Sequence, residues 1–313
     1  MRQRWLYQIY RAESDSKNRG PFQELIKLDI SISKICGIVV TFNPDCNITN
    51  LAIERLRHQV SQVIIVDNAS KVTDWLSALE VDFPDIRVLR NGHNAGLAAG
   101  LNQGITYALS EFKPEWIFIL DQDSILEGDA ISVLQGYLND LNPESDIGIL
   151  HLGYKQPYSN PSKRLVTKDF VINSGSLVRS EIYKRLNYRE DFFVDSIDFD
   201  FCFAVRNLGY LILEIDEPLM STRFGLVEGI RKAYPSKRVS SVTRNMTILL
   251  FEKKVSPLTW ALQITDLLKA GVVLEGMKSS ITALVLGLAK SFLWRIREEH
   301  REQNSSSSKH TSE

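Results

Sequence analysis

Short apolar runs alternate with amphipathic stretches from residue 35 to about residue 215. Each run is rich in β-branched and aromatic residues, which is typical of a strand covered on both faces. The first predicted strands are ICGIVVTF (35–42), QVIIVDNAS (62–70), IRVLRN (86–91) and EWIFIL (115–120), and the predicted helices between them are 46–59, 74–79 and 95–112. This alternation with short connections predicts a parallel sheet with right-handed crossovers.

The second half of the chain changes character. We expect further strands at 146–154 and 170–178, then a helix that begins near Ser196 after an acidic loop. Beyond about residue 238 the composition is helical, and the last residues are polar and serine-rich, which predicts disorder. The expected organisation is an extension without an assigned role, an α/β domain, a helical region and a disordered tail, at 1–34, 35–235, 236–300 and 301–313.

Composition and charge exclude several classes of protein. The 313 residues include 37 Lys and Arg against 38 Asp and Glu, and a net charge of -1 gives no support for nucleic-acid binding. The three cysteines show no CxxC spacing, which favours a reducing, cytoplasmic location without disulfides or a zinc cluster. The first residues lack the apolar core of a secretory signal. No uninterrupted apolar run reaches about 18 residues, so we expect no membrane-spanning helix.

The first three predicted strands end in small polar residues or glycine. Carboxyl ends of parallel strands share one edge of a sheet, where open α/β proteins bind their ligands. These segments contain neither a GxGxxG fingerprint nor a GxxxxGK[ST] phosphate loop. Each segment alone is also ordinary turn chemistry, and only the recurrence favours a nucleotide site. The candidate ligand-binding residues are Thr41, Asn43, Asp67, Asn68, Asn94 and Gly96.

The fourth predicted strand ends in two carboxylates, Asp121 and Asp123, with Gln122 between them. An isolated buried carboxylate is very unfavourable, so both acids must lie at the open end of the strand. Two carboxylates there suit Mg²⁺ or Mn²⁺, which bind through one or two carboxylates together with substrate phosphates. An acidic loop without a metal is the alternative interpretation. The metal is favoured because a diphosphate needs neutralising and the chain lacks a glycine-rich phosphate loop.

A second acidic cluster lies in EDFFVDSIDFDFC (190–202) and contains Asp195, Asp198 and Asp200. If the helix begins near Ser196, these acids fall in its first turns, where the helix dipole stabilises negative charge. They also lie among aromatic and aliphatic residues, and desolvation there raises the pKa of a carboxylate, which suits a general base. Both interpretations stay open.

These segments together resemble the inverting family-two glycosyltransferases of the GT-A fold, most closely their bacterial rhamnosyltransferase branch. The matching stretches follow the expected order over residues 35 to about 215: VVTFNP, IIVDNAS, NAGLAAGLNQGI, FILDQDS, INSGSLV and FVDSIDFDFC. The resemblance implies a Rossmann-like, mostly parallel α/β sheet flanked by helices, with a C-terminal helical extension.

The resemblance also implies roles for individual residues. Asp67 would help to read the nucleotide base, while Asp121 and Asp123, with Gln122 beside them, would hold the ribose and the metal on the diphosphate. Asp198 occupies the position of the catalytic base. Candidates for contacts to the acceptor or to a phosphate are Ser174, Gly175, Asp195, Asp200, Arg238 and Arg244.

The implied reaction is a single in-line displacement at the anomeric carbon of a nucleotide-sugar. Asp198 would take the proton from the attacking hydroxyl of the acceptor, and no covalent enzyme intermediate is needed. The resemblance implies dTDP-L-rhamnose as the donor, a metal ion on the diphosphate and a lipid-linked or growing surface-polysaccharide glycan as the acceptor.

Several positions depart from the family pattern. Asp200 stands where a glutamate is usual, and Thr222 where a histidine is usual. Arg238, Arg244 and Asn245 are kept, but two tyrosines between them are replaced by Ser240 and Ser241. The two arginines either bind a phosphate bidentately or lie on a solvated helix face. These departures weaken the prediction of rhamnose more than that of a glycosyltransferase, so a UDP-sugar is the alternative donor.

The helical region carries Lys290, Arg295 and Arg297 beside the segment Phe292–Trp294. Such a helix either lies on a membrane surface or packs on the sheet or a second subunit. Because the acceptors of the family are often lipid-linked, peripheral attachment to the inner face of the cytoplasmic membrane is a reasonable expectation.

Two other classes of function compete with a transferase. Haloacid-dehalogenase-type phosphatases also place Asp-x-Asp after a strand, but normally after the first strand, with Thr or Val where this chain has Ile125. A non-catalytic glycan-binding descendant of a transferase would account for the altered C-terminal motifs.

Overall fold

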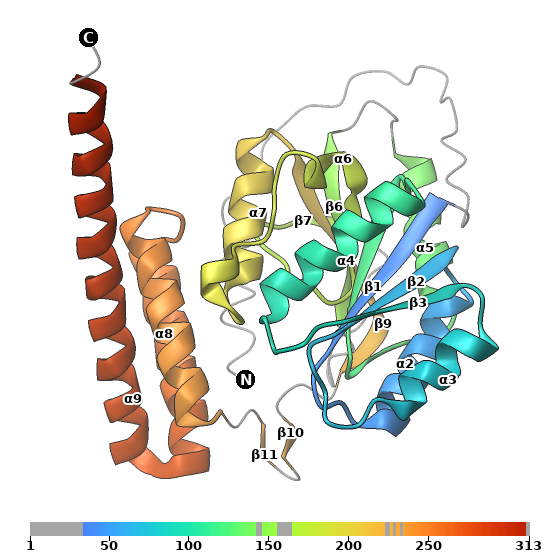
Figure 1. Cartoon of the computed structure of the whole chain (residues 1–313), viewed down its shortest axis with the longest axis horizontal. Helices are drawn as coiled ribbons and strands as arrows, with labels where there is room; N and C mark the ends of the chain where they lie inside the picture. Colours follow the sequence, from blue (N-terminus) through green and yellow to red (C-terminus); the bar gives the residue numbers. More distant parts are fainter. Residues whose placement is uncertain are drawn as a thin grey trace.

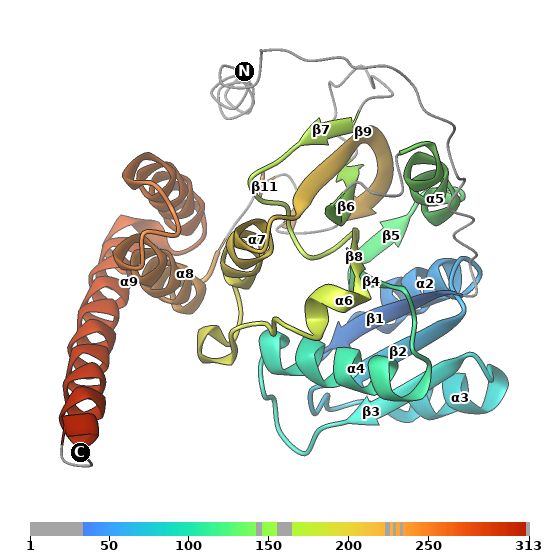
Figure 2. The same ribbon diagram turned by 90° about the horizontal axis from the view of Figure 1, so that it is seen from above.

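The computed structural model describes residues 34–141, 146–154, 165–222, 226–227, 230–231 and 234–310. Nearly all of the predicted N-terminal extension therefore lies outside the described residues. Figures 1 and 2 show a sheet with helices on both faces and a group of long C-terminal helices beside it.

The first half of the sheet is parallel, as the sequence predicts. Its strands are β1 (Ile35–Thr41), β2 (Gln62–Asp67), β3 (Ile86–Arg90) and β4 (Trp116–Asp121), in the spatial order β3-β2-β1-β4. The connecting helices are α2 (Cys46–Arg57), α3 (Asp74–Asp82) and α4 (Leu97–Glu111). Thr41 pairs with Asp67, and Val40 pairs with Asp121. The predicted polar strand ends therefore meet at one edge of the sheet.

The second half of the sheet is mixed. β8 (Ser176–Arg179) is antiparallel to β4 and to β6 (Ile147–Tyr154), and β6 runs parallel to β9 (Leu211–Thr222). The strand predicted at 170–178 begins only at Ser176, because a turn closes between Asn173 and Ser176 and Gly175 has a positive φ of 85°. The sequence did not predict four short strands: β5 (Ser124–Leu126), β7 (Leu165–Thr167), β10 (Leu226–Val227) and β11 (Ile230–Arg231).

Two apolar layers hold the helices to the sheet. Alternate residues of a strand face opposite sides, so Ile38 and Val40 of β1 join one layer while Ile35 and Val39 join the other. The first layer contacts α4 and α7 (Ile197–Asn207), and the second contacts α2, α3 and α5 (Ala130–Asp140). β4 is buried on both faces up to its last residue, as its continuous apolar run predicts.

The C-terminal region consists of α8 (Ser236–Phe251) and α9 (Pro257–His310). α9 turns back at Gly276, whose φ of 82° and ψ of 168° are not helical. Both parts of α9 pack along α8, as Figure 1 shows, and Trp260 donates its indole N–H to Thr247 at 3.0 Å. α8 and α9 also bury residues in the first apolar layer, including Val239, Met246 and Ile264. The helical region is thus joined to the core of the α/β domain.

The structure differs from two expectations for this region. The predicted disordered tail is helical as far as His310, which is consistent with its Glu, Arg and Gln residues extending an existing helix at little cost. In addition, Pro257–Glu299 contains a window of 18 residues with a mean hydropathy of 1.5, so by length and composition alone this segment meets the criterion for a membrane-crossing helix. The apolar run is interrupted by single polar residues, which is why it was not expected from the sequence.

The contact between α8 and the second part of α9 generates a prediction about stability. A Cβ atom at Gly287 would lie 2.6 Å from the carbonyl oxygen of Ser240 and 2.7 Å from Thr243 Cβ. Alanine normally stabilises a helix interior by about 1 kcal/mol over glycine. We expect Gly287→Ala to do the opposite and to lower the free energy of unfolding by about 1–3 kcal/mol, because backbone must move.

Gly136→Ala is the matched control, since this helical glycine of α5 has nothing within 4 Å of an added Cβ. Urea unfolding followed by circular dichroism should move the two midpoints in opposite directions. Equal stabilisation by both substitutions would contradict the close approach of α8 and α9.

Candidate active site

The ends of β1 and β2 are joined by a buried hydrogen bond. The Thr41 hydroxyl donates to Asp67 Oδ1 at 2.9 Å, and the Ser70 amide donates to Asp67 Oδ2 at 3.0 Å. Thr41 is fully buried and Asp67 is 2% exposed. Thr41 and Asp67 were both predicted to bind a ligand, and their hydrogen bonds fix the conformation of the strand ends.

Further polar contacts connect the loops that follow these strands. Asn43 has a positive φ of 46°, its amide donates to Ser70 Oγ at 2.8 Å, and its Oδ1 accepts the Lys71 amide at 3.0 Å. Gln122, after β4, accepts the Phe42 amide at 2.8 Å through Oε1. The predicted residues of three strand ends thus form one connected rim, with Phe42 44% exposed on it.

The start of α4 is closed by the acidic loop. Asn68 is buried and donates to the Gly96 carbonyl at 2.9 Å, while Asn94 Oδ1 accepts the Gly96 amide at 3.0 Å. Gly96 has a φ of 93°, and a Cβ there would lie 2.6 Å from the Phe193 carbonyl oxygen. That carbonyl accepts the Leu97 amide at 2.7 Å. An N–H group that a helix start would otherwise offer to a phosphate is therefore occupied by the protein.

The two carboxylates after β4 rest on a serine pair. Ser174 Oγ accepts the Asp121 amide at 3.0 Å and donates to Ser124 Oγ at 2.9 Å. Gly175, which follows Ser174, donates its amide to the Ile119 carbonyl of β4 at 2.8 Å. Ser174 and Gly175 were predicted as acceptor or phosphate contacts, and the structure places them directly beneath the Asp121 backbone.

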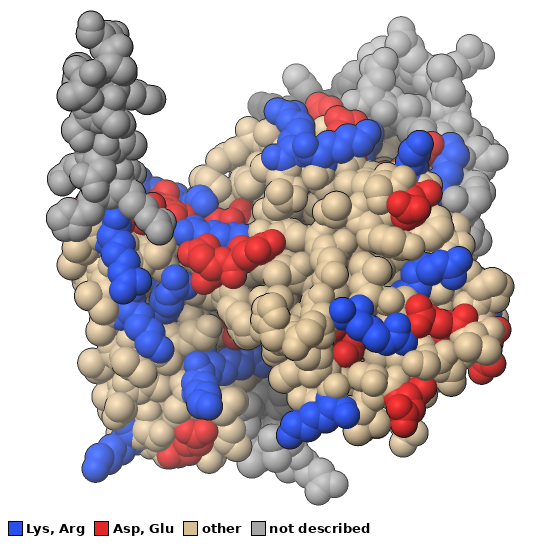
Figure 3. All heavy atoms as spheres, in the orientation of Figure 1, with Lys and Arg blue, Asp and Glu red and all other residues tan. Residues whose placement is uncertain are grey.

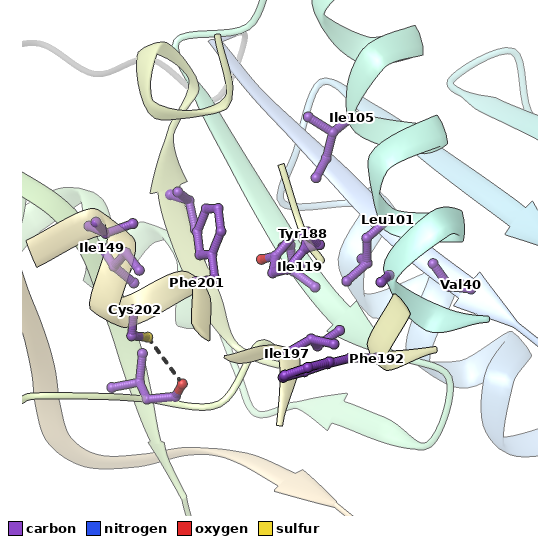
Figure 4. Close-up of a cluster of buried hydrophobic side chains, with 14 of the residues drawn as sticks. Val40, Leu101, Ile105, Ile119, Ile149, Tyr188, Phe192, Ile197, Phe201 and Cys202 are labelled. Carbon is purple, nitrogen blue, oxygen red and sulfur yellow. Dashed lines mark hydrogen bonds between the residues drawn. The ribbon is translucent and has the colours of Figure 1, made fainter. Parts of the chain in front are cut away.

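The acidic loop before α7 has a strained backbone. Phe193, Asp195 and Ser196 have positive φ values of 58°, 63° and 62°, which are unusual for residues other than glycine. Phe192 and Ile197 flank this segment, and both are buried in the first apolar layer, where Figure 4 shows them beside each other. The loop is thus held at both ends by apolar contacts, and its polar residues Asp195 and Ser196 are themselves largely buried.

α8 supplies the polar contacts that hold the loop. The Asn245 amide nitrogen lies 3.1, 3.1 and 3.0 Å from the carbonyl oxygens of Phe192, Val194 and Asp195. Arg238 donates to Asp195 Oδ1 from Nε at 3.0 Å and from Nη2 at 2.7 Å. Asp195 Oδ2 is buried and has no hydrogen-bond partner among the described residues. The carboxylate is therefore fixed through one oxygen only.

The acids of β4 and of the loop meet electrostatically at Arg238. The pKa of Asp121 is raised to about 7, chiefly by burial and also by the charges of Asp123 and Asp198, against the opposing effect of Arg238. Burial also raises the pKa of Asp123. The pKa of Asp198 is raised to about 6, chiefly by burial and also by Asp195, against a hydrogen bond from the Phe199 amide.

The donor set suits a divalent cation shared with a substrate. Asp121 and Asp123 are half-buried carboxylates, and the negative charge of Asp123 raises the pKa of Asp121. A cation between the two side chains would relieve this repulsion. Among the described residues, no group of three or more His, Cys, Asp or Glu side chains is placed to hold a metal. The pair therefore fits Mg²⁺ or Mn²⁺ that takes its remaining ligands from phosphate oxygens and water.

Two predicted residues lie in a different network. Asp200 Oδ1 pairs with Lys254 Nζ at 2.6 Å, and Arg244 donates to the Asp191 carbonyl at 3.1 Å. Arg189 links the same group by pairing with Asp191 and with Glu252, at 2.7 and 2.8 Å. These pairs fasten α7 and η2 (Glu190–Phe192) to the end of α8. A role of Asp200 or Arg244 in binding the acceptor stays a prediction.

The sequence interpretation missed some functional contacts and left others incomplete. Asn245 was noticed only as part of a motif, and the three carbonyls it contacts lie about 50 residues earlier in the chain. Ser240, which replaces a family tyrosine, is buried where α8 meets Gly287 of α9. The atom of Ser240 that approaches Gly287 is its carbonyl oxygen. The side chain of Thr222 lies outside the described residues.

Comparison with known proteins identifies relatives of the chain. The family model of glycosyl transferase family 2 matches residues 37–208. The dTDP-rhamnosyl transferase RfbF of Shigella flexneri is 28% identical over 201 residues, which cover 58% of this chain and 66% of RfbF. The match thus spans slightly less than two thirds of that relative.

Solved structures share the fold at low sequence identity. The mannosyltransferase PcManGT from Pyrobaculum calidifontis, in complex with GDP-Man and Mn²⁺, has a TM-score of 0.55 and 14% identity, covering 92% of this chain and 82% of its own. S. aureus TarS 1–349, in complex with UDP-GlcNAc, has a TM-score of 0.50 and 16% identity, covering 80% and 79%. Together with the family match, this likeness confirms the predicted GT-A fold.

The contacts of Asn245 generate a prediction about the acidic loop. Asn245→Ala leaves three buried or half-buried carbonyls without this donor, so we expect unfolding to become easier by about 1–3 kcal/mol. Amide hydrogen exchange at 193–196 should also accelerate. The control Asn47→Ala, at an exposed position of α2, should change stability by less than about 0.5 kcal/mol. Unchanged exchange in the loop would contradict the holding role of Asn245.

Proposed function

The chain belongs to glycosyl transferase family 2, and on that premise we propose that it is an inverting, metal-assisted transferase of L-rhamnose from dTDP-L-rhamnose. The observation that carries the proposal is the meeting of Asp121, Asp123 and Asp198 at Arg238, on the edge where the parallel strands end. A pair of carboxylates for a metal diphosphate and a separate carboxylate with a raised pKa are the two elements that this reaction needs.

The choice of donor rests on similarity and on the rim of the site. Structural neighbours are described in complex with GDP-Man and with UDP-GlcNAc, which supports a nucleotide-sugar. The similarity to a dTDP-rhamnosyl transferase supports dTDP-L-rhamnose. On the rim, Asn43, Gln122 and the exposed ring of Phe42 would contact the nucleoside, with Asp67 beneath them.

A second donor class has an observation in its favour. The position of the family tyrosine is occupied here by the buried Ser240, whose carbonyl oxygen approaches Gly287 of α9. A protein without the tyrosine side chain would contact the sugar through other residues, so a UDP-sugar is the alternative donor.

The reaction would proceed by one displacement. The acceptor hydroxyl attacks the anomeric carbon of the sugar, the bond from that carbon to the diphosphate oxygen breaks, and Asp198 takes the hydroxyl proton. Asp121 and Asp123 would hold a divalent cation, which neutralises charge on the departing nucleoside diphosphate. Asp195 and Arg238 would keep the acidic loop oriented, and much of the rate would come from alignment of the two substrates.

The acceptor would be a lipid-linked or growing glycan of a surface polysaccharide, with the enzyme attached peripherally to the inner face of the cytoplasmic membrane. The exposed apolar residues of α9 support this location. Ser174, Gly175, Asp195, Asp200 and the arginines of α8 are the proposed contacts for acceptor or phosphate.

Donor binding gives the first test of the proposal. Calorimetric titration with a panel of nucleotide-sugars should show binding of dTDP-L-rhamnose that needs Mn²⁺ or Mg²⁺. Asp123→Asn should weaken this metal-dependent binding at least about tenfold, because one of two carboxylate ligands is lost. Asp129→Asn, an exposed acid at the start of α5, is the control and should bind normally.

The outcomes of this titration separate the parts of the proposal. Binding of no nucleotide-sugar would overturn the transferase mechanism at this site. Preference for a UDP-sugar would remove rhamnose alone, and robust hydrolysis of an aryl phosphate would favour the phosphatase alternative.

The raised pKa of Asp198 gives the second test. A base must be ionised to accept a proton, so with a pKa of about 6 the turnover rate should fall about tenfold per pH unit below that value and level off above it. Asp198→Asn should lower turnover by about 10²–10⁴-fold and abolish this acidic limb, while donor binding persists.

Asp82→Asn, an exposed acid on α3, serves as the control for removal of one negative charge. Its pH profile should match that of the unmodified protein. At a saturating Mn²⁺ concentration, which would keep Asp121 ionised, retention of the acidic limb in Asp198→Asn would assign the limb to another group and would remove Asp198 as the base.

A further inference from the structure

The second part of α9 turns its large apolar side chains outward. Seven of them are 49–65% exposed: Met277, Ile281, Val285, Leu286, Phe292, Leu293 and Ile296. Of these, Phe292 also contacts Phe251 of α8, with 5.3 Å between the ring centroids. Small residues occupy buried positions on the side that packs against α8 and the first part of α9, namely Ser280, Ala283, Gly287 and Ser291. A helix on the surface of a globular protein normally shows the opposite distribution. An exposed apolar surface of this extent marks an interaction site.

The charges along the exposed apolar face have one sign, and the nearest acids, Glu275, Glu298 and Glu299, lie just beyond its two ends. From Met277 to Arg297 the sequence contains four basic residues and no acid: Lys278, Lys290, Arg295 and Arg297. Arg295 pairs with Glu299 at 2.7 Å, and the other three form no ion pair among the described side chains. Lys290 and Arg297 are seven residues apart and so lie on the same side of the helix, at an edge of the apolar face. Figure 3 shows basic side chains spaced along α9.

We propose that the outer face of α9 from Met277 to Arg297 binds the surface of a membrane that contains anionic lipids. The apolar side chains would enter the boundary between headgroups and acyl chains, and the cations at the edge would contact lipid phosphates. This combination of a wide apolar face, flanking Lys and Arg and no carboxylate is complementary to an anionic lipid surface.

A second copy of the chain fits this face less well. In a two-fold symmetric contact the same surface meets itself. The cations of one copy would then approach those of the other, because the carboxylates of each copy lie beyond the ends of the face, at Glu275 and at Glu298 and Glu299. Like charges in a contact are unfavourable, so the charge pattern favours lipid over self-association.

The packing of α9 favours a helix that lies in the membrane surface over one that spans the bilayer. α8 touches α9 so closely that a Cβ at Gly287 would meet the Ser240 carbonyl oxygen. A spanning α9 would draw α8 into the hydrocarbon with it, including Arg238 and Arg244, and charged groups are costly there. Both arginines are instead committed to the acidic loop, through Asp195 and Asp191.

The inner side of the same helix reaches the acidic loop. The Arg189 guanidinium lies 5.3 Å from the centre of the Trp294 ring and is paired with Asp191. The membrane-binding face and the loop that carries Asp198 therefore belong to one packed unit. This inference makes the membrane attachment in the proposed function specific, and it rests on that function only for the lipid-linked nature of the acceptor.

Vesicle flotation of the full chain tests the proposal. The protein should float with vesicles of phosphatidylcholine and phosphatidylglycerol, bind those of phosphatidylcholine alone much more weakly, and be released by 0.5 M salt (roughly a Debye length of 4–5 Å). Lys290→Gln with Arg297→Gln should weaken binding about 30-fold at low salt, since each cation contributes roughly a factor of five. Lys184→Gln with Arg185→Gln, an exposed pair beside α6 (Ser180–Tyr183), is the charge-matched control.

The apolar contribution needs its own variant. Val285→Ser, Leu293→Ser and Ile296→Ser together should reduce binding at least about tenfold, because each residue loses apolar area that would leave water. Val81→Ser on α3, where the valine is 85% exposed, should have no effect. Circular dichroism and Mn²⁺-dependent nucleotide binding report whether each variant is folded.

Three outcomes would overturn the proposal. The first is no flotation of the unmodified chain, or flotation that ignores lipid charge and salt. The second is a dimer in light scattering that dissociates in the triple variant, which would assign the face to a second copy. The third is resistance to extraction by alkaline carbonate, which would indicate a spanning helix. Flotation without any nucleotide-sugar binding would leave the surface standing and refute the proposed function alone.

Discussion

Four carboxylates gathered around one guanidinium set the conditions for the rest of the site. Asp121 and Asp123 come from the end of β4, Asp195 and Asp198 from the loop before α7, and Arg238 from α8. Burial is the main cause that raises the pKa of each of these acids, and Arg238 opposes the shift in all four. In the proposed reaction a divalent cation would compensate the charges of Asp121 and Asp123, and phosphate oxygens of the donor would supply further ligands to it.

This constraint also explains why the C-terminal helices belong to the catalytic unit. The loop between Phe192 and Ile197 adopts a backbone that is unfavourable for its residues, and apolar burial at its two ends leaves its carbonyls to be satisfied. Asn245 of α8 contacts three of these carbonyls, and Arg238 of α8 fixes the Asp195 carboxylate. α8 in turn is held by α9, whose outer face is apolar and basic. A chain of contacts therefore runs from the loop that carries Asp198, the proposed base, to the proposed membrane surface.

The sequence predicted the parts of the fold that rest on local patterns. The apolar runs at β1, β2 and β4 gave their strands almost to the residue, and the acids at the end of β4 were correctly expected at an open strand end. Contacts between distant segments could not be read in this way. Asp67 and Asn68 were expected to bind a ligand. In the structure Asp67 accepts a hydrogen bond from Thr41, and Asn68 donates one to the Gly96 carbonyl. Both contacts depend on which strand ends lie side by side. The turn at Gly276 and the outward face of α9 were missed because helical periodicity does not say which face a neighbouring helix will cover.

The central claim is that Asp198 activates an acceptor for one direct displacement, with no sugar–enzyme bond. The anomeric configuration of the first-formed product tests it most directly, measured by proton NMR during turnover of a nucleotide-sugar donor of known configuration. The account predicts a product whose anomeric centre is inverted relative to the donor. A product that retains the donor configuration would require two displacements through a covalent or equivalent intermediate, and would contradict the role assigned to Asp198 and the arrangement of acids around it.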